Sequence, residues 1–179
     1  MPPSLRSTLT RLVPGLTSVA SVASAGAGEL TASIEIPQLN VAEYHRPYVA
    51  VWIETPKRAF AANVAVKYDV EMADNEGETW LKDLRQWWRK SGRELDLPLD
   101  GVSGPTLPVG THDITVATSA PALSELPAGN YVLVVEASRE VGGRELVRVP
   151  FAWGANQSVE ASAAGKSELG NITLRISQP

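Results

Sequence analysis

The sequence predicts an antiparallel β-sandwich of about seven strands with one inserted amphipathic α-helix. Three observations support this fold class. Short segments alternate apolar and polar residues, turn residues separate those segments, and a single stretch shows helical periodicity. Alternation at every second residue is typical of a strand with one buried face. Because short connections join most neighbouring segments, antiparallel pairing is favoured.

Three strands are predicted before the helix. Apolar residues alternate with polar or small ones over residues 30–36, and Pro37 ends that segment. Tyr48–Glu54 is apolar on both faces, which predicts a central strand. Valine and tyrosine alternate with lysine and aspartate over residues 63–70, and a polar turn then leads into the helix.

The predicted strands after the helix complete one domain. The alternating patterns lie at residues 112–118, 131–138, 145–153 and 172–176. A Val-Gly-Gly-Arg hairpin signal occupies 141–144, and the small, polar residues 154–168 predict a loop. No internal repeat divides the chain. Residues 29–179 are therefore expected to form a single sandwich of the immunoglobulin/fibronectin-like type.

The predicted helix spans residues 79–91. Thr79 is placed to cap its start and Gly92 to follow its end. We interpret its three tryptophans either as core residues that pack the helix onto a sheet, or with one indole lining a site for a flat ring. The apolar stripe consists of Trp80, Leu81, Leu84, Trp87 and Trp88. The outer face carries Lys82, Arg85, Gln86, Arg89 and Lys90.

The composition argues against several classes of function. A formal net charge of −4 without a strongly basic patch argues against nucleic-acid binding. Cysteine is absent, which excludes disulfides, thiolate metal sites and cysteine nucleophiles. His45 and His112 lack the spacing of metal ligands, so no metal site is predicted. Neither a Gly-x-Ser-x-Gly motif nor a paired-acid motif is present, so we assign no catalytic residue and expect no independent enzymatic activity.

Residues 1–28 have the features of an export signal. Arg6 and Arg11 form a positive segment, a weakly apolar segment follows at 12–23, and small residues at 23–27 match a cleavage site. This pattern predicts a periplasmic protein. The mature chain is expected to be soluble, since no apolar run approaches the ~20 residues that span a bilayer. The alternative is a disordered tail on a cytoplasmic protein.

Three runs carry a resemblance to a known family. RPYVAVWIE, WLKDLRQWWRKSG and PAGNYVLVVEASREVGGRELVRVPF, in that order, resemble the predicted periplasmic bacterial proteins of the domain-of-unknown-function family numbered twenty-two seventy-one. The resemblance covers residues 30–177. Members of that family are often encoded beside membrane reductases of the PepSY type and beside flavin transferases. The resemblance therefore implies a role in extracytoplasmic electron transfer.

The loop at residues 100–106 resembles the acceptor sequence of extracytoplasmic flavinylated proteins. Asp100 matches the leading acid of that pattern, Ser103 and Gly104 match its Ser-Gly pair, and Thr106 matches the acceptor. In such proteins a flavin transferase moves FMN from FAD onto the acceptor hydroxyl. Pro105 departs from the usual alanine, because proline fixes φ and removes an N–H group. The alternative interpretation is a plain connecting loop, since D-G and S-G-P are ordinary turn signals.

Two functional hypotheses follow. In the first, the protein carries FMN on Thr106 and serves a membrane reductase, with Trp87, Trp88 or Trp80 shielding a flavin face and Arg89 or Arg93 offsetting the phosphate charge. In the second, a non-redox binding or accessory domain docks a membrane partner through the cationic helix face.

Overall fold

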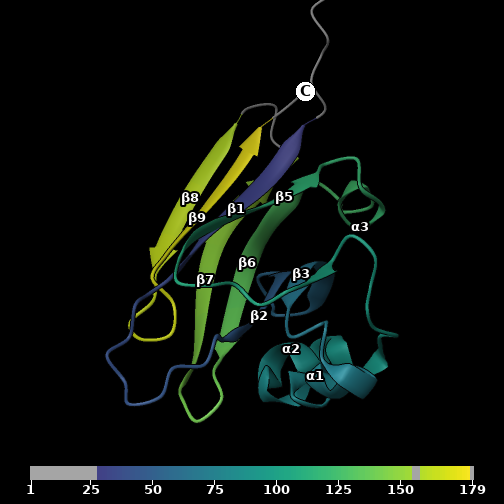
Figure 1. The fold of residues 1–179 in the computed structure, drawn as a ribbon. Coiled ribbons are helices and arrows are strands. Elements are labelled where there is room, and N and C mark those ends of the chain that lie inside the picture. Colours follow the sequence, from purple (N-terminus) through teal and green to yellow (C-terminus); the bar gives the residue numbers. More distant parts are fainter. Residues whose placement is uncertain (1–27, 155–157, 178–179) are drawn as a thin grey trace, which may run out of the picture.

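A computed structural model describes residues 28–154 and 158–177 of the chain (Figure 1). The predicted export signal lies outside the described residues, apart from Gly28. The carbonyl of Gly28 accepts hydrogen bonds from the amide of Thr118, at 2.8 Å, and from its hydroxyl, at 3.0 Å.

The strands form two sheets, as the predicted β-sandwich requires. One sheet has four strands in the order β5-β1-β9-β8, and the other has five in the order β4-β3-β2-β6-β7. All strand pairs are antiparallel except β3–β4. The strands are β1 (Glu29–Ile36), β2 (Tyr48–Glu54), β3 (Phe60–Lys67), β4 (Ser103–Gly104), β5 (Gly110–Ala117), β6 (Gly129–Ser138), β7 (Arg144–Trp153), β8 (Val159–Ala164) and β9 (Asn171–Ser177).

The described residues thus contain nine strands, and two of them differ from the sequence prediction. The predicted loop at 154–168 contains β8, whose half-buried face carries only Val159, Ala161 and Ala163. Such small side chains give little apolar contrast. The second strand that the sequence did not predict is β4, which is only two residues long and precedes Thr106.

The main core lies between the two sheets. Alternate residues of β1 and β9 meet alternate residues of β2, β6 and β7 there. The outer face of the five-stranded sheet is also apolar, because Ala50, Trp52, Val66 and Val134 lie under a helical layer. β2 is consequently buried on both faces between β3 and β6, which confirms the predicted central strand.

The helical layer corrects the prediction of one continuous helix at 79–91. It consists of α1 (Glu76–Thr79), η2 (Leu81–Asp83), α2 (Arg85–Lys90) and η3 (Gly92–Glu94). Leu84 breaks the helical path with φ −75° and ψ 65°, yet the side chains of Leu81, Leu84 and Trp87 are fully buried as the stripe predicts. A short helix, α3 (Pro121–Ser124), lies elsewhere, between β5 and β6.

Both ends of the predicted helix also differ from expectation. Thr79 ends α1 rather than capping a start, and its hydroxyl donates to the carbonyl of Glu76 at 2.7 Å. Gly92 begins η3, where a Cβ atom would lie 2.5 Å from the Trp87 ring. Close packing against that ring therefore accounts for the glycine, in place of a helix-ending turn.

A buried carboxylate from the sheet explains why the helical path breaks. Glu136 of β6 is fully buried and accepts hydrogen bonds from the backbone N–H groups of Gln86, at 3.1 Å, and Trp87, at 2.8 Å. These N–H groups open α2 and have no partner in the preceding turn of a helix that starts here. Arg144 of β7 pairs with the same carboxylate. The sheet thus supplies the cap that fixes α2 in place.

We predict that Glu136→Ala lowers the free energy of unfolding by about 2–4 kcal/mol, because it leaves one buried N–H group, one part-buried N–H group and one cation without their acceptor. Urea unfolding measures the loss. Glu160→Ala is the matched control, since Glu160 pairs with Arg175 on the exposed surface of the other sheet. Its cost should be below about 1 kcal/mol. Equal losses in the two variants would contradict the capping role.

Candidate functional site

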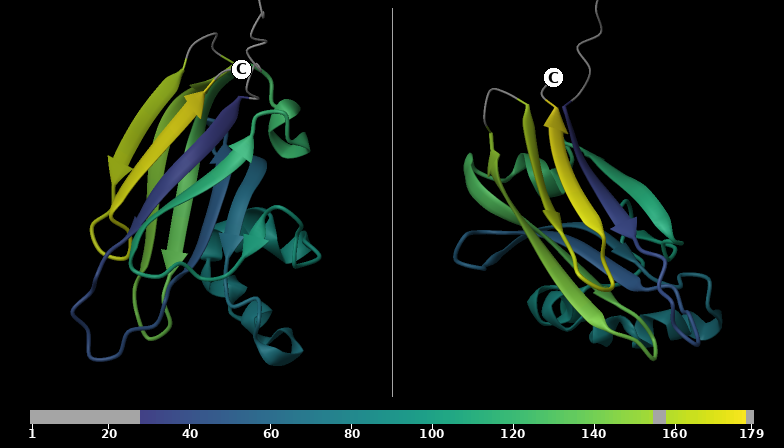
Figure 2. Two further views of the ribbon diagram at one scale, coloured as in Figure 1. Left: turned by 45° about the horizontal axis from the view of Figure 1, so that its top comes forward. Right: turned by 90° about the vertical axis from the view of Figure 1, so that its left-hand side faces the viewer.

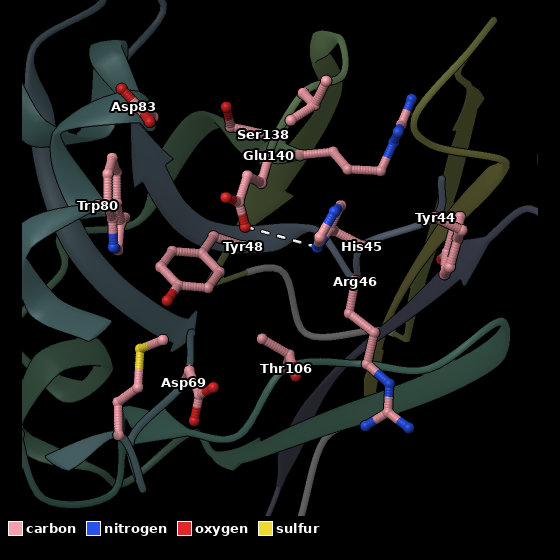
Figure 3. A pocket seen from close by; sticks show the side chains of 13 residues that line it. Tyr44, His45, Arg46, Tyr48, Asp69, Trp80, Asp83, Thr106, Ser138 and Glu140 are labelled. Carbon is pink, nitrogen blue, oxygen red and sulfur yellow. Dashed lines mark ion pairs between the residues drawn. The ribbon is translucent and has the colours of Figure 1, made fainter. Parts of the chain in front are cut away.

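A pocket of about 570 Å³ opens at one end of the sandwich. The segment before β2, the segment after β3, the helical layer, the segment after β4 and the β6–β7 hairpin all contribute to it. Figure 3 shows the Tyr48 ring between Trp80 and His45, with Thr106 and Asp69 below them in this view. The start of β1 and the end of β9 lie at the other end of the sandwich (Figure 1). The pocket is therefore remote from both ends of the described chain.

Thr106, the predicted FMN acceptor, lines this pocket and is half-buried. The chain that leads to Thr106 is held in place by β4, which adds a short parallel strand to β3. The N–H of Val66 donates to the carbonyl of Val102, and the N–H of Tyr68 donates to that of Gly104, each at 3.0 Å. Thr106 thus lies two residues beyond Gly104, which the second of these hydrogen bonds anchors to β3.

The other residues of the predicted acceptor loop shape the path to Thr106 without lining the pocket. The Ser103 hydroxyl accepts a hydrogen bond from the N–H of Leu99 at 2.8 Å, which closes the loop on itself. Gly101 has φ +70°, a conformation that glycine adopts without strain. At Gly104 a Cβ atom would lie 2.6 Å from Lys67 Nζ. Asp100 is exposed, and no described residue donates a hydrogen bond to its carboxylate.

The tryptophans separate into core and pocket residues. Trp87 is fully buried, and its indole N–H donates to the Asn63 amide oxygen at 2.9 Å. Trp88 is half-buried beside it, with ring centroids 6.4 Å apart. The structure brings neither to Thr106. Trp80 lines the pocket, 45% exposed, with Lys82 Nζ 5.6 Å from its ring.

Two tyrosines add aromatic surface that the sequence did not single out. Tyr48 is half-buried in the pocket, and burial raises the pKa of its hydroxyl. Burial likewise raises the pKa of Tyr44, partly offset by the nearby Arg139, and no described residue hydrogen-bonds the Tyr44 hydroxyl. The position of Tyr48 at the start of an apolar strand was the available sequence signal. Met72 adds a further apolar side chain.

Charged groups of both signs line the pocket. Arg139 already has a partner, because its guanidinium donates two hydrogen bonds, of 2.9 and 3.1 Å, to buried Glu168. Arg46 is exposed and forms no ion pair with a described residue. Carboxylates also line the pocket, and His45 Nδ1 lies 3.5 Å from one of them, Glu140. The predicted phosphate partners Arg89 and Arg93 lie outside the pocket lining, and Arg93 contacts Glu94 instead.

A second pocket of about 450 Å³ lies between β3 and β5. Lys67 lines it, and burial lowers the pKa of this lysine. His112 lines it too, with a ring nitrogen 2.7 Å from the carbonyl of Pro108. Among the described residues no hydroxyl hydrogen-bonds a histidine, and no group of three potential ligands surrounds a metal position.

The chain belongs to the family described as "Predicted periplasmic protein (DUF2271)", whose model matches residues 29–171. This membership shows a periplasmic location and covers most of the sandwich. Neither a curated protein nor a solved structure matches the chain. No helix within the described part of the chain is long and apolar enough to cross a membrane.

We predict that Trp87 and Trp80 differ sharply in their effect on stability. Trp87→Ala removes a fully buried ring and should lower the free energy of unfolding by about 3–5 kcal/mol. Trp80→Ala changes an exposed side chain and should cost less than about 1 kcal/mol. Urea unfolding followed by circular dichroism compares the two. A large loss for Trp80→Ala would show that this ring is part of the core.

Proposed function

We propose that the protein is a covalent FMN carrier in periplasmic electron transfer, with FMN attached at Thr106 and a membrane reductase as its redox partner. One observation carries the proposal. The residue that matches the flavin acceptor lies in the larger of the two pockets described above, together with aromatic side chains. A plain connecting loop gives no reason for this coincidence. The immunoglobulin/fibronectin-like type of the sandwich also remains our proposal, supported by two facing sheets.

The attachment requires only a hydroxyl from this chain. The Thr106 Oγ1 atom forms a bond to the phosphorus on the FMN side of FAD, the P–O–P bond breaks, and AMP leaves. The hydroxyl proton passes to a base on the transferase. No electron changes hands in this step, so the chain needs no redox group of its own for it. Pro105 is exposed beside Thr106, and the hydrogen bond from Tyr68 to Gly104 already holds the backbone there.

The pocket residues fit a flavin in size and chemistry. A volume of about 570 Å³ lies within the range of ~300–1,000 Å³ that small-molecule sites occupy. Tyr48 and Trp80 offer ring faces on which a flat heterocycle stacks. Arg46 is the lining cation that no described carboxylate pairs with, so it is the residue best placed to offset a phosphate charge. Bound FMN supplies reversible transfer of one or two electrons.

The second candidate function is a non-redox accessory domain that docks a membrane partner through the cationic helix face. Lys82, Arg85 and Arg89 are exposed along the helical layer, which favours this candidate. Lys90 belongs to the fold instead, because its ammonium lies 3.2 Å from the buried carboxylate of Glu54. In this case the chain stays free of flavin, and its partner binding weakens with salt and with loss of Arg85 and Arg89.

The test is the intact mass of the chain exported from a host with an active flavin transferase. We expect an increase equal to one phosphoester-linked FMN, with yellow colour and flavin fluorescence. Thr106→Ala should abolish the increase, whereas Thr106→Ser should retain it, because serine keeps the hydroxyl. Thr111→Ala is the control, since Thr111 is exposed and lies outside this pocket.

An unmodified wild-type chain, in a host that modifies a known acceptor, would contradict the proposal. The second candidate would then be tested by salt-dependent binding of the Arg85→Gln/Arg89→Gln variant to membrane proteins. A chain modified at another residue would retain the flavin and overturn the assignment to Thr106.

A further inference from the structure

The exposed large apolar side chains of the described chain gather around one end of the sandwich. Met72, Trp80 and Val141 line the Thr106 pocket, and Val141 is 83% exposed. The others lie on the same connecting segments that build the pocket: Val41, Val70 and Val109. The connection between β1 and β2, the β6–β7 hairpin and α1 lie at this end in every view (Figures 1 and 2). Exposed apolar side chains that gather in this way mark interaction sites.

Acidic residues surround this apolar end. The segment 69–83 contains six acidic residues and a single basic one, Lys82. Two exposed carboxylates, Glu43 and Glu140, add to them from the other connections. The acidic residues of the segment are Asp69, Glu71, Asp74, Glu76, Glu78 and Asp83. Arg46 is an exposed cation of the pocket lining, so the surface around the pocket is apolar, with acidic side chains outnumbering basic ones.

We infer that this end of the sandwich, the acidic rim of the Thr106 pocket, is the docking face for a protein partner with a basic and partly apolar surface. The inference rests on the proposed function, and it assigns the flavin transferase as a partner that binds there. A transferase must reach a half-buried hydroxyl at the base of the rim. Apolar contacts then hold the complex, while opposite charges speed and orient the encounter.

Charge distinguishes this occupant from a second copy of the chain. A two-fold interface brings the same patch of each protomer together, so it would set the rim acids of one copy against those of the other. Like charges in close contact oppose such pairing. The exposed face along Lys82, Arg85 and Arg89 is cationic, and its sign suits an acidic partner rather than a basic one.

The experiment measures the initial rate of FMN attachment against the concentration of the acceptor chain, with purified flavin transferase and FAD. Two rim variants are compared with the wild type: Glu71→Lys/Asp74→Lys, which reverses charge, and Val41→Ser/Val141→Ser, which removes apolar surface. All four side chains are exposed, and Asp74 and Val141 have positive φ, so thermal unfolding of each variant checks that the fold is kept. We expect each variant to raise KM by about tenfold and to leave kcat within about twofold, because docking and not chemistry is weakened.

Salt dependence and matched control variants show whether charge or apolar contact causes a change in KM. The effect of charge reversal should shrink in about 0.5 M salt, whereas the effect of the apolar variant should persist. Glu125→Lys/Glu160→Lys makes the same change of charge at exposed positions outside the rim and should leave KM unchanged. Arg85→Gln/Arg89→Gln tests the cationic face in the same way.

Each outcome decides the inference. An unchanged KM in both rim variants, while Thr106 is still modified, overturns the docking face and leaves the FMN proposal intact. A raised KM in Arg85→Gln/Arg89→Gln alone moves docking to the cationic face and also overturns it. Failure of the wild-type chain to accept FMN, while a known acceptor is modified, overturns the proposed function and this inference together.

Discussion

The Glu136 carboxylate is the interaction on which the rest of the structure depends. It lies fully buried on the outer face of the five-stranded sheet, where an unpaired charge would cost several kcal/mol. The backbone N–H groups of Gln86 and Trp87, together with Arg144, offset that cost. Because these partners come from α2 and β7, the carboxylate fixes the helical layer at one position on the sheet. Trp87 then becomes a core residue, and Trp80 is left at the edge of the layer, where the pocket begins.

The pocket is a consequence of how several connections meet at one end of the sandwich. β4 holds the chain against β3 and directs it past Thr106, while the helical layer and the β6–β7 hairpin form the opposite walls. Buried Glu168 accepts from Arg139 and from the N–H of Gly143, which fixes the hairpin. The site thus belongs to loops positioned by a rigid scaffold, the arrangement in which binding residues are most often found. This placement favours a binding site at this end of the sandwich, which the FMN proposal requires.

The sequence predicts those features of the fold that depend on local pattern. Tyr48–Glu54 is apolar at every position that must be buried, so its central place follows directly. The helical stripe correctly identifies Leu81, Leu84 and Trp87 as core. The break at Leu84 escapes prediction, because its cause is Glu136, which lies 52 residues away in the chain and 50 beyond Gln86. β8 escapes because alanine and serine give a strand no apolar contrast. The motif at Thr106 is local and can be found in the sequence. Tyr48, Met72 and Arg46 line the same pocket only because the tertiary fold brings their segments together.

The charge distribution gives the two proposals a common physical basis. The molecule carries a net charge of −4, yet its charges are segregated. The charged residues of the segment 69–83 are all acidic except Lys82, and the cations at Arg85 and Arg89 follow this segment directly in the helical layer. Segregated charge orients a molecule during diffusional encounter, which net charge alone does not. A carrier must meet more than one protein, first to receive its cofactor and later to exchange electrons. Two adjacent surfaces of opposite sign allow such partners to be distinguished by charge.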